Sequence, residues 1–218
     1  MSSSTLHTLI CYDIIRRLPF VMGEKMPLIV GRHTSTDDNL NGVYSGQRDV
    51  PLNNVGRGEA NALARTIAAQ FGPDIVAILS SDLRRATYLA STLSSRLPGV
   101  PVTRTRDLRE VSLGRIEQER LTWAQLTERY PGPKYQTRQE FDFTDVGGES
   151  KRQLIARGRR MMARVDAIFR QQPEPAMAYV VMISHGTFLR VLLQYYGLLS
   201  GELHPHGSFQ IVLLPLRP

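Results

Sequence analysis

Two histidines of this chain each follow a short apolar run, and this placement points to chemistry. Residues 28–31 are followed by Arg32 and His33, and residues 179–184 are followed by His185. Continuous apolar runs of this length are typical of buried strands in a parallel sheet. Ligands of open α/β sheets bind beyond the carboxyl ends of the strands, so we expect both histidines at one site.

Arginine, imidazole and carboxyl groups together can transfer a phosphoryl group. Guanidinium groups offer a fixed fork of donors that matches phosphate oxygens. A neutral imidazole can attack phosphorus, which divides one difficult displacement into two easier steps through a covalent intermediate. A carboxylic acid close by must protonate the departing alkoxide and later deprotonate water. A single histidine at a strand end is more often structural, so it is the pair that favours a catalytic site.

Apolar strands alternate with amphipathic helices along the rest of the chain. We expect strands over 28–31, 75–79, 100–103, 179–184 and 208–214, and helices over 56–71, 83–97, 123–130, 151–171 and 187–196. Residues 80–82 are expected to cap the helix 83–97, and residues 147–150 to cap the helix 151–171. This alternation predicts an α/β fold, a three-layer α/β/α sandwich with a mostly parallel central sheet.

Length and composition fit an ordinary globular domain. The chain has 218 residues, of which 42% are hydrophobic and 22% charged,. We expect a single domain over 27–218, preceded by an N-terminal extension of uncertain structure over 1–26. In that extension Arg16 and Arg17 follow the apolar stretch, the reverse of a secretory signal,. Cys11 is the only cysteine, which excludes an internal disulfide and is consistent with a reducing compartment, so we expect a cytoplasmic protein,.

The charge of the chain favours anionic partners. Its net charge is +7 and its pI is about 9.9,. A generally arginine-rich composition explains this as readily as a nucleic-acid surface does, and the sequence has no lysine run,. We expect a small-molecule phosphomonoester as the partner, with no specific nucleic acid and no membrane, and we leave a homodimer open. No apolar run reaches the ~18 residues that a membrane span needs.

The two histidine segments resemble the histidine phosphatase (phosphoglycerate mutase-like) superfamily. Its members open with Arg-His-Gly on the first strand, compared with Arg32-His33-Thr34 here, and carry Ser-His-Gly or a similar motif near the end, as in residues 184–186. The resemblance extends from about residue 27 to about residue 214. It implies that His33 is the phosphorylated nucleophile, that Arg32 binds phosphate, and that His185 donates to the phosphoryl oxygens.

Two further segments are similar to motifs of this family. Residues 81–86, Ser-Asp-Leu-Arg-Arg-Ala, are similar to its Ser-x-Leu-x-Arg-Ala segment, which implies that Arg85 is the second phosphate-binding arginine. Residues 108–114 are similar to its Leu-x-Glu-x-x-x-Gly segment, which implies that Glu110 is the general acid and base. Taken alone, an Arg-Arg pair at a helix start or a single Glu would carry little information.

The expected substrate contacts come from three parts of the chain: Asn39, Ser45, Gly46, Thr34 and Gly186. Asn39 matches an asparagine that lines the family's pocket, and Gly186 lets the chain turn from strand to helix close to the anion. Thr34 stands where glycine is usual, and its hydroxyl is expected to reach the pocket. Val43 stands where many members have arginine, so contacts to the non-phosphate half of the substrate are expected to differ.

We expect neither a metal nor a cofactor, because the resemblance implies a family that needs none. The sequence has no acidic cluster of the kind that holds Mg²⁺,. His204 and His206 are two residues apart near the last strand, and we expect them to be exposed loop residues rather than metal ligands.

The resemblance implies a metal-independent phosphomonoester hydrolase that acts through phosphohistidine on a small metabolite. A sugar phosphate, an α-ribazole phosphate-like compound, phosphoglycerate and a phosphoprotein all remain open as substrates. A phosphoglycerate mutase-type transferase and a non-catalytic phospho-ligand-binding protein are the alternatives. Mutases of this fold carry a longer insertion, whereas Gly148 lies only 38 residues after Glu110. A protein that only binds its ligand would be expected to lack His33 or Glu110.

Overall fold

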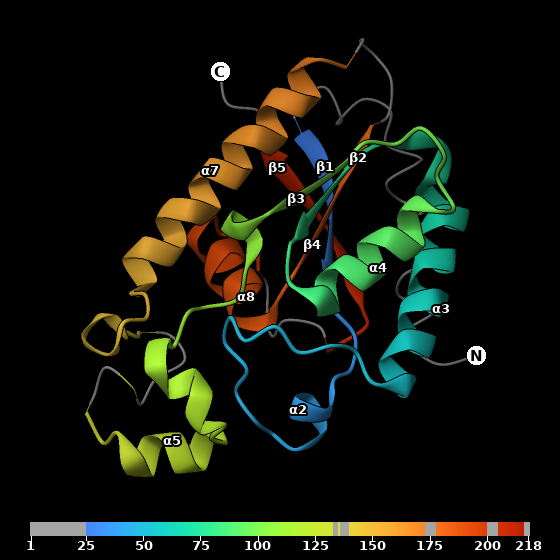
Figure 1. The fold of residues 1–218 in the computed structure, drawn as a ribbon. Helices are drawn as coiled ribbons and strands as arrows, with labels where there is room; N and C mark the ends of the chain where they lie inside the picture. The colour runs from blue at the N-terminus through green and yellow to red at the C-terminus, as the bar shows by residue number, and fades with distance from the viewer. Residues whose placement is uncertain (1–24, 133–134, 136–139, 173–177, 200–204, 216–218) are drawn as a thin grey trace.

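The computed structural model describes residues 25–132, 135, 140–172, 178–199 and 205–215 (Figure 1). They contain a five-stranded sheet with the order β3-β2-β4-β1-β5. Its strands are β1 (Lys25–Arg32), β2 (Ile75–Ser81), β3 (Val102–Thr105), β4 (Tyr179–Ser184) and β5 (Phe209–Pro215). The first four pair in parallel, and β5 pairs antiparallel with β1. The prediction of a mostly parallel sheet is confirmed.

Helices cover both faces of the sheet, as Figure 1 shows. One face of the sheet carries α3 (Asn54–Phe71) and α4 (Arg84–Ser94), and the other face carries α7 (Lys151–Arg170) and α8 (Gly186–Tyr195). The short helices α2 (Asp37–Leu40) and α5 (Trp123–Arg129) lie beyond the end of the sheet toward which β1 runs. Four 3₁₀ turns complete the described elements: Gly72–Asp74, Arg106–Leu108, Gly114–Glu119 and Thr144–Val146. This is the predicted three-layer sandwich.

The apolar strands divide their side chains between two cores. On β1, Leu28 and Val30 belong to the cluster packed with α7 and α8, whereas Ile29 belongs to the cluster packed with α3 and α4. The alternation follows from the two-residue period of a strand. Every residue of β4 is buried because this strand lies inside the sheet with helices over both faces. The sheet is therefore a rigid support for the residues that follow its strands.

Helix α4 begins differently from the prediction. No side chain of residues 80–82 caps it, and Leu83 is its N-cap. The carboxylate of Asp49 accepts a hydrogen bond from the backbone N–H of Arg84 at 2.7 Å instead. Asp82 is held by Arg109, which donates from Nε at 2.6 Å and from Nη2 at 2.7 Å. The prediction was wrong because a distant arginine binds the expected capping side chain.

The N-terminal cap of α7 is confirmed. Ser150 accepts a hydrogen bond from the backbone N–H of Gln153, and the Gln153 side chain accepts one from the backbone N–H of Ser150. This reciprocal pair is a capping box, which satisfies two backbone donors that the helix itself leaves unpaired.

The first strand starts at Lys25, two residues before the expected domain boundary. Its early start follows from pairing with β5, in which Met26 lies opposite Leu214. The predicted loop 34–54 contains the short helix α2, which begins after a capping box between Thr36 and Asn39. Both differences come from hydrogen bonds that the apolar pattern does not reveal.

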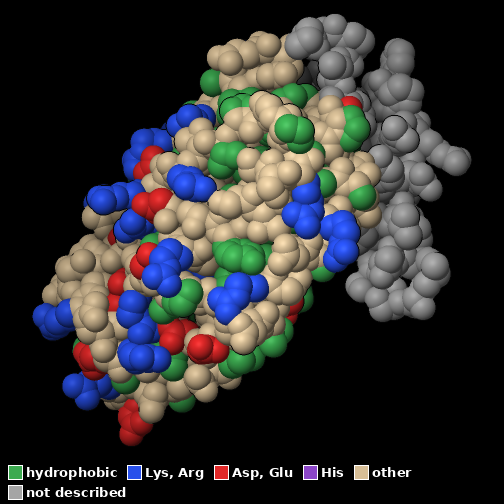
Figure 2. All heavy atoms as spheres, turned by 45° about the vertical axis from the view of Figure 1, so that its right-hand side comes forward, with side chains coloured by type: hydrophobic (Ala, Val, Ile, Leu, Met, Phe, Trp, Pro, Cys, Tyr) green, Lys and Arg blue, Asp and Glu red, His purple; other side chains and the backbone are tan. Residues whose placement is uncertain are grey.

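The surface carries basic side chains without a single basic stripe on the face seen in Figure 2. Lys and Arg side chains are spread over this face, and acidic side chains lie among many of them. In the part of the chain that the structure describes, no helix is both long and apolar enough to cross a bilayer.

Candidate active site

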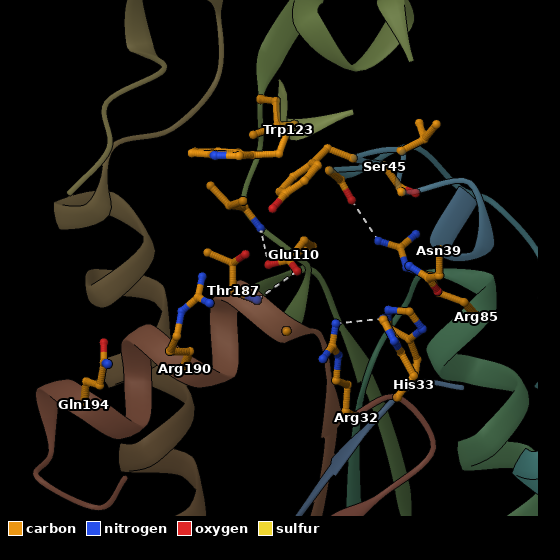
Figure 3. Close-up of a pocket in the computed structure, with 18 residues that line it drawn as sticks. Arg32, His33, Asn39, Ser45, Arg85, Glu110, Trp123, Thr187, Arg190 and Gln194 are labelled. Carbon is orange, nitrogen blue, oxygen red and sulfur yellow. Dashed lines mark hydrogen bonds between the residues drawn. The ribbon is translucent and has the colours of Figure 1, made fainter. Parts of the chain in front are cut away.

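A cavity of about 760 Å³ opens where β1 and β4 end (Figure 3). It brings together eight of the residues predicted from the sequence: Arg32, His33, Asn39, Ser45, Gly46, Arg85, Glu110 and Gly186. His185 is fully buried behind the residues that line the cavity. The ring centroids of His33 and His185 are 5.1 Å apart, so one phosphate could lie within reach of both.

His33 is held as a neutral imidazole with a defined tautomer. Its Nδ1 donates a hydrogen bond to the carbonyl oxygen of Thr34 at 2.8 Å. Burial lowers the pKa of His33 well below its usual value, and the charge of Arg85 lowers it further. The proton of the neutral ring is therefore on Nδ1, which leaves the electron pair of Nε2 available as a nucleophile.

His185 has the opposite tautomer. Its Nδ1 accepts a hydrogen bond from Nε of Arg85 at 3.2 Å, so the proton of the neutral ring is on Nε2,. Burial and the charge of Arg85 lower the pKa of His185 well below its usual value. Within the described residues, Nε2 is buried without a hydrogen-bond partner. A buried donor of this kind is costly unless a ligand accepts from it.

Arg85 is the buried cation of the site. Burial lowers its pKa to about 10, so it stays charged at neutral pH. Nη1 donates to the carbonyl oxygen of Arg48 at 2.8 Å, and Nη2 donates to that of Gly46 at 2.7 Å. Each terminal nitrogen carries a second hydrogen, so two N–H groups remain to bind an anion.

Arg32 is oriented by His206, a residue that was expected to be exposed in a loop. Its Nη2 donates to Nε2 of His206 at 2.7 Å. The His206 ring lies 5.3 Å from the His33 ring, centroid to centroid, and it lines the cavity. Burial and the charge of Arg32 lower the pKa of His206 to about 4. The prediction that His206 is an exposed loop residue was wrong; His204 lies outside the described residues.

The Glu110 carboxylate lies at the N-terminus of α8. Its Oε1 accepts from the backbone N–H groups of Val111 and Phe188, both at 2.9 Å, and Oε2 accepts from that of Thr187 at 3.0 Å. The sequence predicts that the anion near Gly186 is the substrate. The anion that occupies the first turn of α8 is instead this carboxylate, which is thereby fixed in orientation.

The backbone that carries Glu110 is held by the buried Arg157 of α7. Arg157 donates to the carbonyl oxygens of Asp107 at 2.9 Å, Arg109 at 2.6 Å and Glu110 at 3.1 Å. It also forms a two-pronged ion pair with Glu149, at 3.0 and 2.6 Å. Three donated hydrogen bonds therefore fix the segment Asp107–Glu110 to α7, and the ion pair with Glu149 holds the guanidinium that donates them.

Two glycines permit close approaches in the site. Gly46 has φ +52°, and a Cβ atom there would lie 2.5 Å from Oε1 of the buried Glu117. A Cβ atom at Gly186 would lie 2.8 Å from Nη2 of Arg32. A larger residue at either position would displace the side chain of Glu117 or of Arg32.

The remaining predicted residues have structural contacts as well. Asn39 lines the cavity, and its side-chain oxygen accepts from the backbone N–H of Thr36 at 3.1 Å. Ser45 also lines it and donates to Asp38 at 2.7 Å. The expectation for Thr34 needs correction. Its hydroxyl donates to the carbonyl oxygen of Gly56 at 2.7 Å, and Thr34 is not among the residues that line the cavity.

Four lining residues that were not predicted as site residues extend the cavity away from His33: Tyr44, Trp123, Arg190 and Gln194. One signal for Arg190 was present in the sequence, because it follows Gly186 by four residues and so lies on the same face of a helix. Tyr44 and Trp123 had no such local signal. Among the residues that the structure describes, no cluster of three or more His, Cys, Asp or Glu could hold a metal ion.

Comparisons with known proteins agree on one family. The sequence model of the histidine phosphatase superfamily (branch 1) matches residues 28–210. A glucosyl-3-phosphoglycerate phosphatase of Mycobacterium tuberculosis is 34% identical over 170 residues, which cover 76% of this chain and 72% of that protein. A 2,3-bisphosphoglycerate-dependent phosphoglycerate mutase of Beijerinckia indica is 28% identical over 82% of this chain and 84% of its own.

The fold of a solved relative agrees with this match. A mycobacterial glucosyl-3-phosphoglycerate phosphatase in complex with VO3 is similar with a TM-score of 0.70 and 31% identity. The similarity covers 85% of this chain and 90% of that one.

Proposed function

Because the chain belongs to the histidine phosphatase superfamily, we propose that it hydrolyses a small phosphomonoester through a phosphohistidine on His33. One observation supports this most strongly. The bond from Nδ1 of His33 to the carbonyl oxygen of Thr34 places the proton of the neutral ring on Nδ1 and leaves the electron pair on Nε2,. An imidazole held in this tautomer is ready to attack phosphorus without losing a proton first.

In the first step, Nε2 of His33 forms a bond to phosphorus as the ester oxygen departs. Arg32 and Arg85 hold the phosphoryl oxygens, and the unpartnered Nε2–H of His185 donates to one of them,. The Thr34 carbonyl oxygen stabilises the positive charge that develops on the His33 ring. Glu110, in its protonated form, gives its proton to the leaving oxygen, and the products are the free alcohol and phosphohistidine.

In the second step, water breaks the phosphorus–nitrogen bond. The Glu110 carboxylate takes one proton from the water as its oxygen attacks phosphorus. Inorganic phosphate leaves, and His33 returns to the neutral tautomer with its proton on Nδ1. No metal has a part in either step.

Release of inorganic phosphate is the expected result that tests this function. Purified protein should be incubated with glucosyl-3-phosphoglycerate, 3-phosphoglycerate, sugar phosphates and phenyl phosphate, in buffer that contains EDTA. Free phosphate is measured colorimetrically, and the esters are followed by phosphorus NMR. Isomerised ester without free phosphate would favour the mutase. Unchanged esters throughout, with a folded protein, would contradict both enzymes and favour a binding protein.

Replacement of His206 by alanine is expected to lower kcat/KM by about 10- to 150-fold, because Arg32 loses its acceptor and a bond from a charged donor contributes about 1.5–3 kcal/mol,. His206→Asn should restore part of the loss, because its amide oxygen can accept. The loss should be constant between pH 5 and 8, since a pKa of about 4 keeps His206 neutral there. A loss that grows as pH falls from 8 to 6 would instead indicate that His206 acts as a charged group.

We further propose a cytoplasmic location, which the single cysteine of the chain supports,. The spread of basic side chains in Figure 2 fits a small anionic substrate better than a specific nucleic acid,. Light scattering after size-exclusion chromatography would distinguish a monomer from a homodimer.

A further inference from the structure

Glu117 is a buried carboxylate that the two chemical steps do not use. It lies in the 3₁₀ turn Gly114–Glu119 and is not among the residues that line the cavity. In the part of the chain that the structure describes, no Lys or Arg forms an ion pair with it. Burial of a carboxylate is costly unless other groups bind it, so its partners indicate its role.

Backbone N–H groups from two segments bind this carboxylate. Oε1 of Glu117 accepts from the N–H of Gln47 at 3.0 Å and from that of Leu113 at 2.9 Å, and the Ser112 hydroxyl lies 3.5 Å from the same atom. Oε2 has no hydrogen-bond partner among the described residues. One oxygen atom therefore joins the segment around residue 47 to the segment around residue 113.

One peptide unit connects Glu117 to Arg85. The N–H of Gln47 and the carbonyl oxygen of Gly46 belong to the same planar peptide and point in opposite directions. Glu117 accepts from this N–H, and the carbonyl oxygen accepts from Nη2 of Arg85 at 2.7 Å (Figure 3). A peptide held at its N–H cannot turn its carbonyl oxygen away from Arg85.

The direction of the Arg85 guanidinium depends on this carbonyl oxygen. Arg85 is buried, and no Asp or Glu forms an ion pair with it among the described residues. Its three printed partners are the carbonyl oxygens of Gly46 and Arg48 and the ring of His185. Because a guanidinium is planar and rigid, these bonds fix where its remaining N–H groups point. A shift of the Gly46 carbonyl would turn the donors that are left for phosphate.

The charge of Glu117 is the smaller part of its effect on Arg85. Burial lowers the pKa of Arg85, and three other carboxylates each raise it more than Glu117 does: Glu110, Asp49 and Asp38. The position of Oε1 has no such substitute, because no other side chain among the described residues accepts from the N–H of Gln47.

We propose that Glu117 is a positioning residue of the active site, which fixes the peptide between Gly46 and Gln47 and thereby directs the N–H groups of Arg85 at the phosphoryl group. This inference rests on the proposed phosphatase function. Glu117 acts through the place of its oxygen atom, since a peptide N–H needs an acceptor and not a charge.

Two conservative substitutions separate position from charge. Glu117→Gln removes the charge but keeps an oxygen for both N–H groups, and its amide nitrogen replaces Oε2, which has no partner to lose. Glu117→Asp keeps the charge but withdraws the oxygen by one methylene. Glu117→Gln should keep most of the wild-type kcat/KM. Glu117→Asp should lower it by about 10- to 100-fold, the scale of a misplacement of about 1 Å. A role of the charge predicts the reverse order.

The leaving group shows through which residue Glu117 acts. Arg85 binds the phosphoryl group that all esters share, so Glu117→Asp should lower kcat/KM by equal factors for 4-nitrophenyl phosphate and for alkyl phosphates. The side chain of Gln47 also donates to the carbonyl oxygen of Glu110 at 3.1 Å. An effect through Glu110 would be larger for alkyl esters, because these need its proton. Glu117→Asp should also weaken the binding of inorganic phosphate, which calorimetry measures without turnover.

A double-mutant cycle tests the connection to Arg85. Lysine has no second terminal nitrogen to bind Gly46, so Glu117→Asp should cause little further loss in Arg85→Lys,. Glu128→Gln, an exposed position on α5, is the control for charge. Ile67→Val, a fully buried position on α3 that does not line the cavity, is the control for lowered stability. Both controls should keep the wild-type kcat/KM.

The outcomes separate this inference from the proposed function. Wild-type kcat/KM in Glu117→Asp, an equal loss in Glu117→Gln, a larger loss on alkyl esters, or additive losses with Arg85→Lys would each overturn the inference and leave the phosphatase intact. If Glu117→Asp does not fold, Glu117→Met, which keeps the length and removes the acceptor, takes its place. Failure of the wild-type protein to hydrolyse any ester would overturn the phosphatase function, and the phosphate affinities would still decide the role of Glu117.

Discussion

His33→Ala is expected to abolish hydrolysis of every phosphomonoester, with a loss of at least about 10⁴-fold in kcat. The variant keeps Arg32, Arg85 and His185, so it should still bind phosphate, but it has no atom to accept the phosphoryl group. The fold should persist, because the His33 ring contacts His185 and His206 rather than the two apolar cores. The carbonyl oxygen of Thr34 loses its donor, which should cost about 1–3 kcal/mol of stability,.

A trapping experiment identifies the nucleophile directly. Wild-type protein mixed with labelled substrate and denatured in base should keep the label, and acid should release it, because phosphohistidine is stable to base and labile to acid. His33→Ala should carry no label, and thermal melts of both proteins show whether it is folded. Retained turnover in a folded His33→Ala, or label on another residue, would disprove the covalent role of His33.

The pH dependence of wild-type kcat/KM follows from the same residue. Burial lowers the pKa of His33, so the neutral ring persists as pH falls through 6.5, where a free histidine would become protonated,. The acid limb attributable to His33 is therefore expected below pH 6.5. This rate profile reports groups of the free enzyme, because kcat/KM depends on the free enzyme and substrate.

The sequence predicts the site location of residues that directly follow a strand better than that of residues that reach the site through strand pairing. His33 and His185 follow β1 and β4 directly, and parallel neighbouring strands end at one edge. His206 reaches the site only because β5 pairs antiparallel with β1, with Phe209 opposite Gly31. Nothing local to residue 206 predicts that pairing, so an expectation of exposure was natural for a histidine in a polar loop.

The sequence also does not predict which partner a polar side chain binds when several are available. Thr34 could have directed its hydroxyl to the pocket, but the carbonyl oxygen of Gly56, 22 residues away, lies 2.7 Å from it. In the sequence, nothing distinguishes Arg157 from the other arginines of its amphipathic helix. Its role as the support of the Glu110 segment depends on Glu149, with which it forms a buried ion pair. Burial of a charge requires such a partner, and the sequence does not show which one.

Glu110→Gln is expected to lower kcat/KM, which reports phosphoryl transfer to His33, far more for alkyl phosphates than for aryl phosphates. A phenolate is a good leaving group and needs little protonation, whereas an alkoxide depends on the proton of Glu110. General acid catalysis contributes about 10²–10⁴-fold, and kcat/KM for alkyl esters should fall by that factor. For 4-nitrophenyl phosphate the first step should be nearly unaffected. Glu128→Gln, an exposed position on α5, is the matched control and should leave both rates unchanged.

Glutamine is a suitable substitute for Glu110 because it keeps most of the hydrogen bonds that hold the side chain. A glutamine oxygen can still accept from the N–H groups of Val111 and Phe188, whereas its amide nitrogen would face the N–H of Thr187. One of three backbone bonds is lost, so stability should fall by about 1 kcal/mol while the site persists. The second step still needs a base to activate water, so phosphohistidine should accumulate with the aryl ester, seen as a burst of nitrophenolate equal to the enzyme present. Equal losses on aryl and alkyl esters, without a burst, would remove Glu110 from both proton transfers.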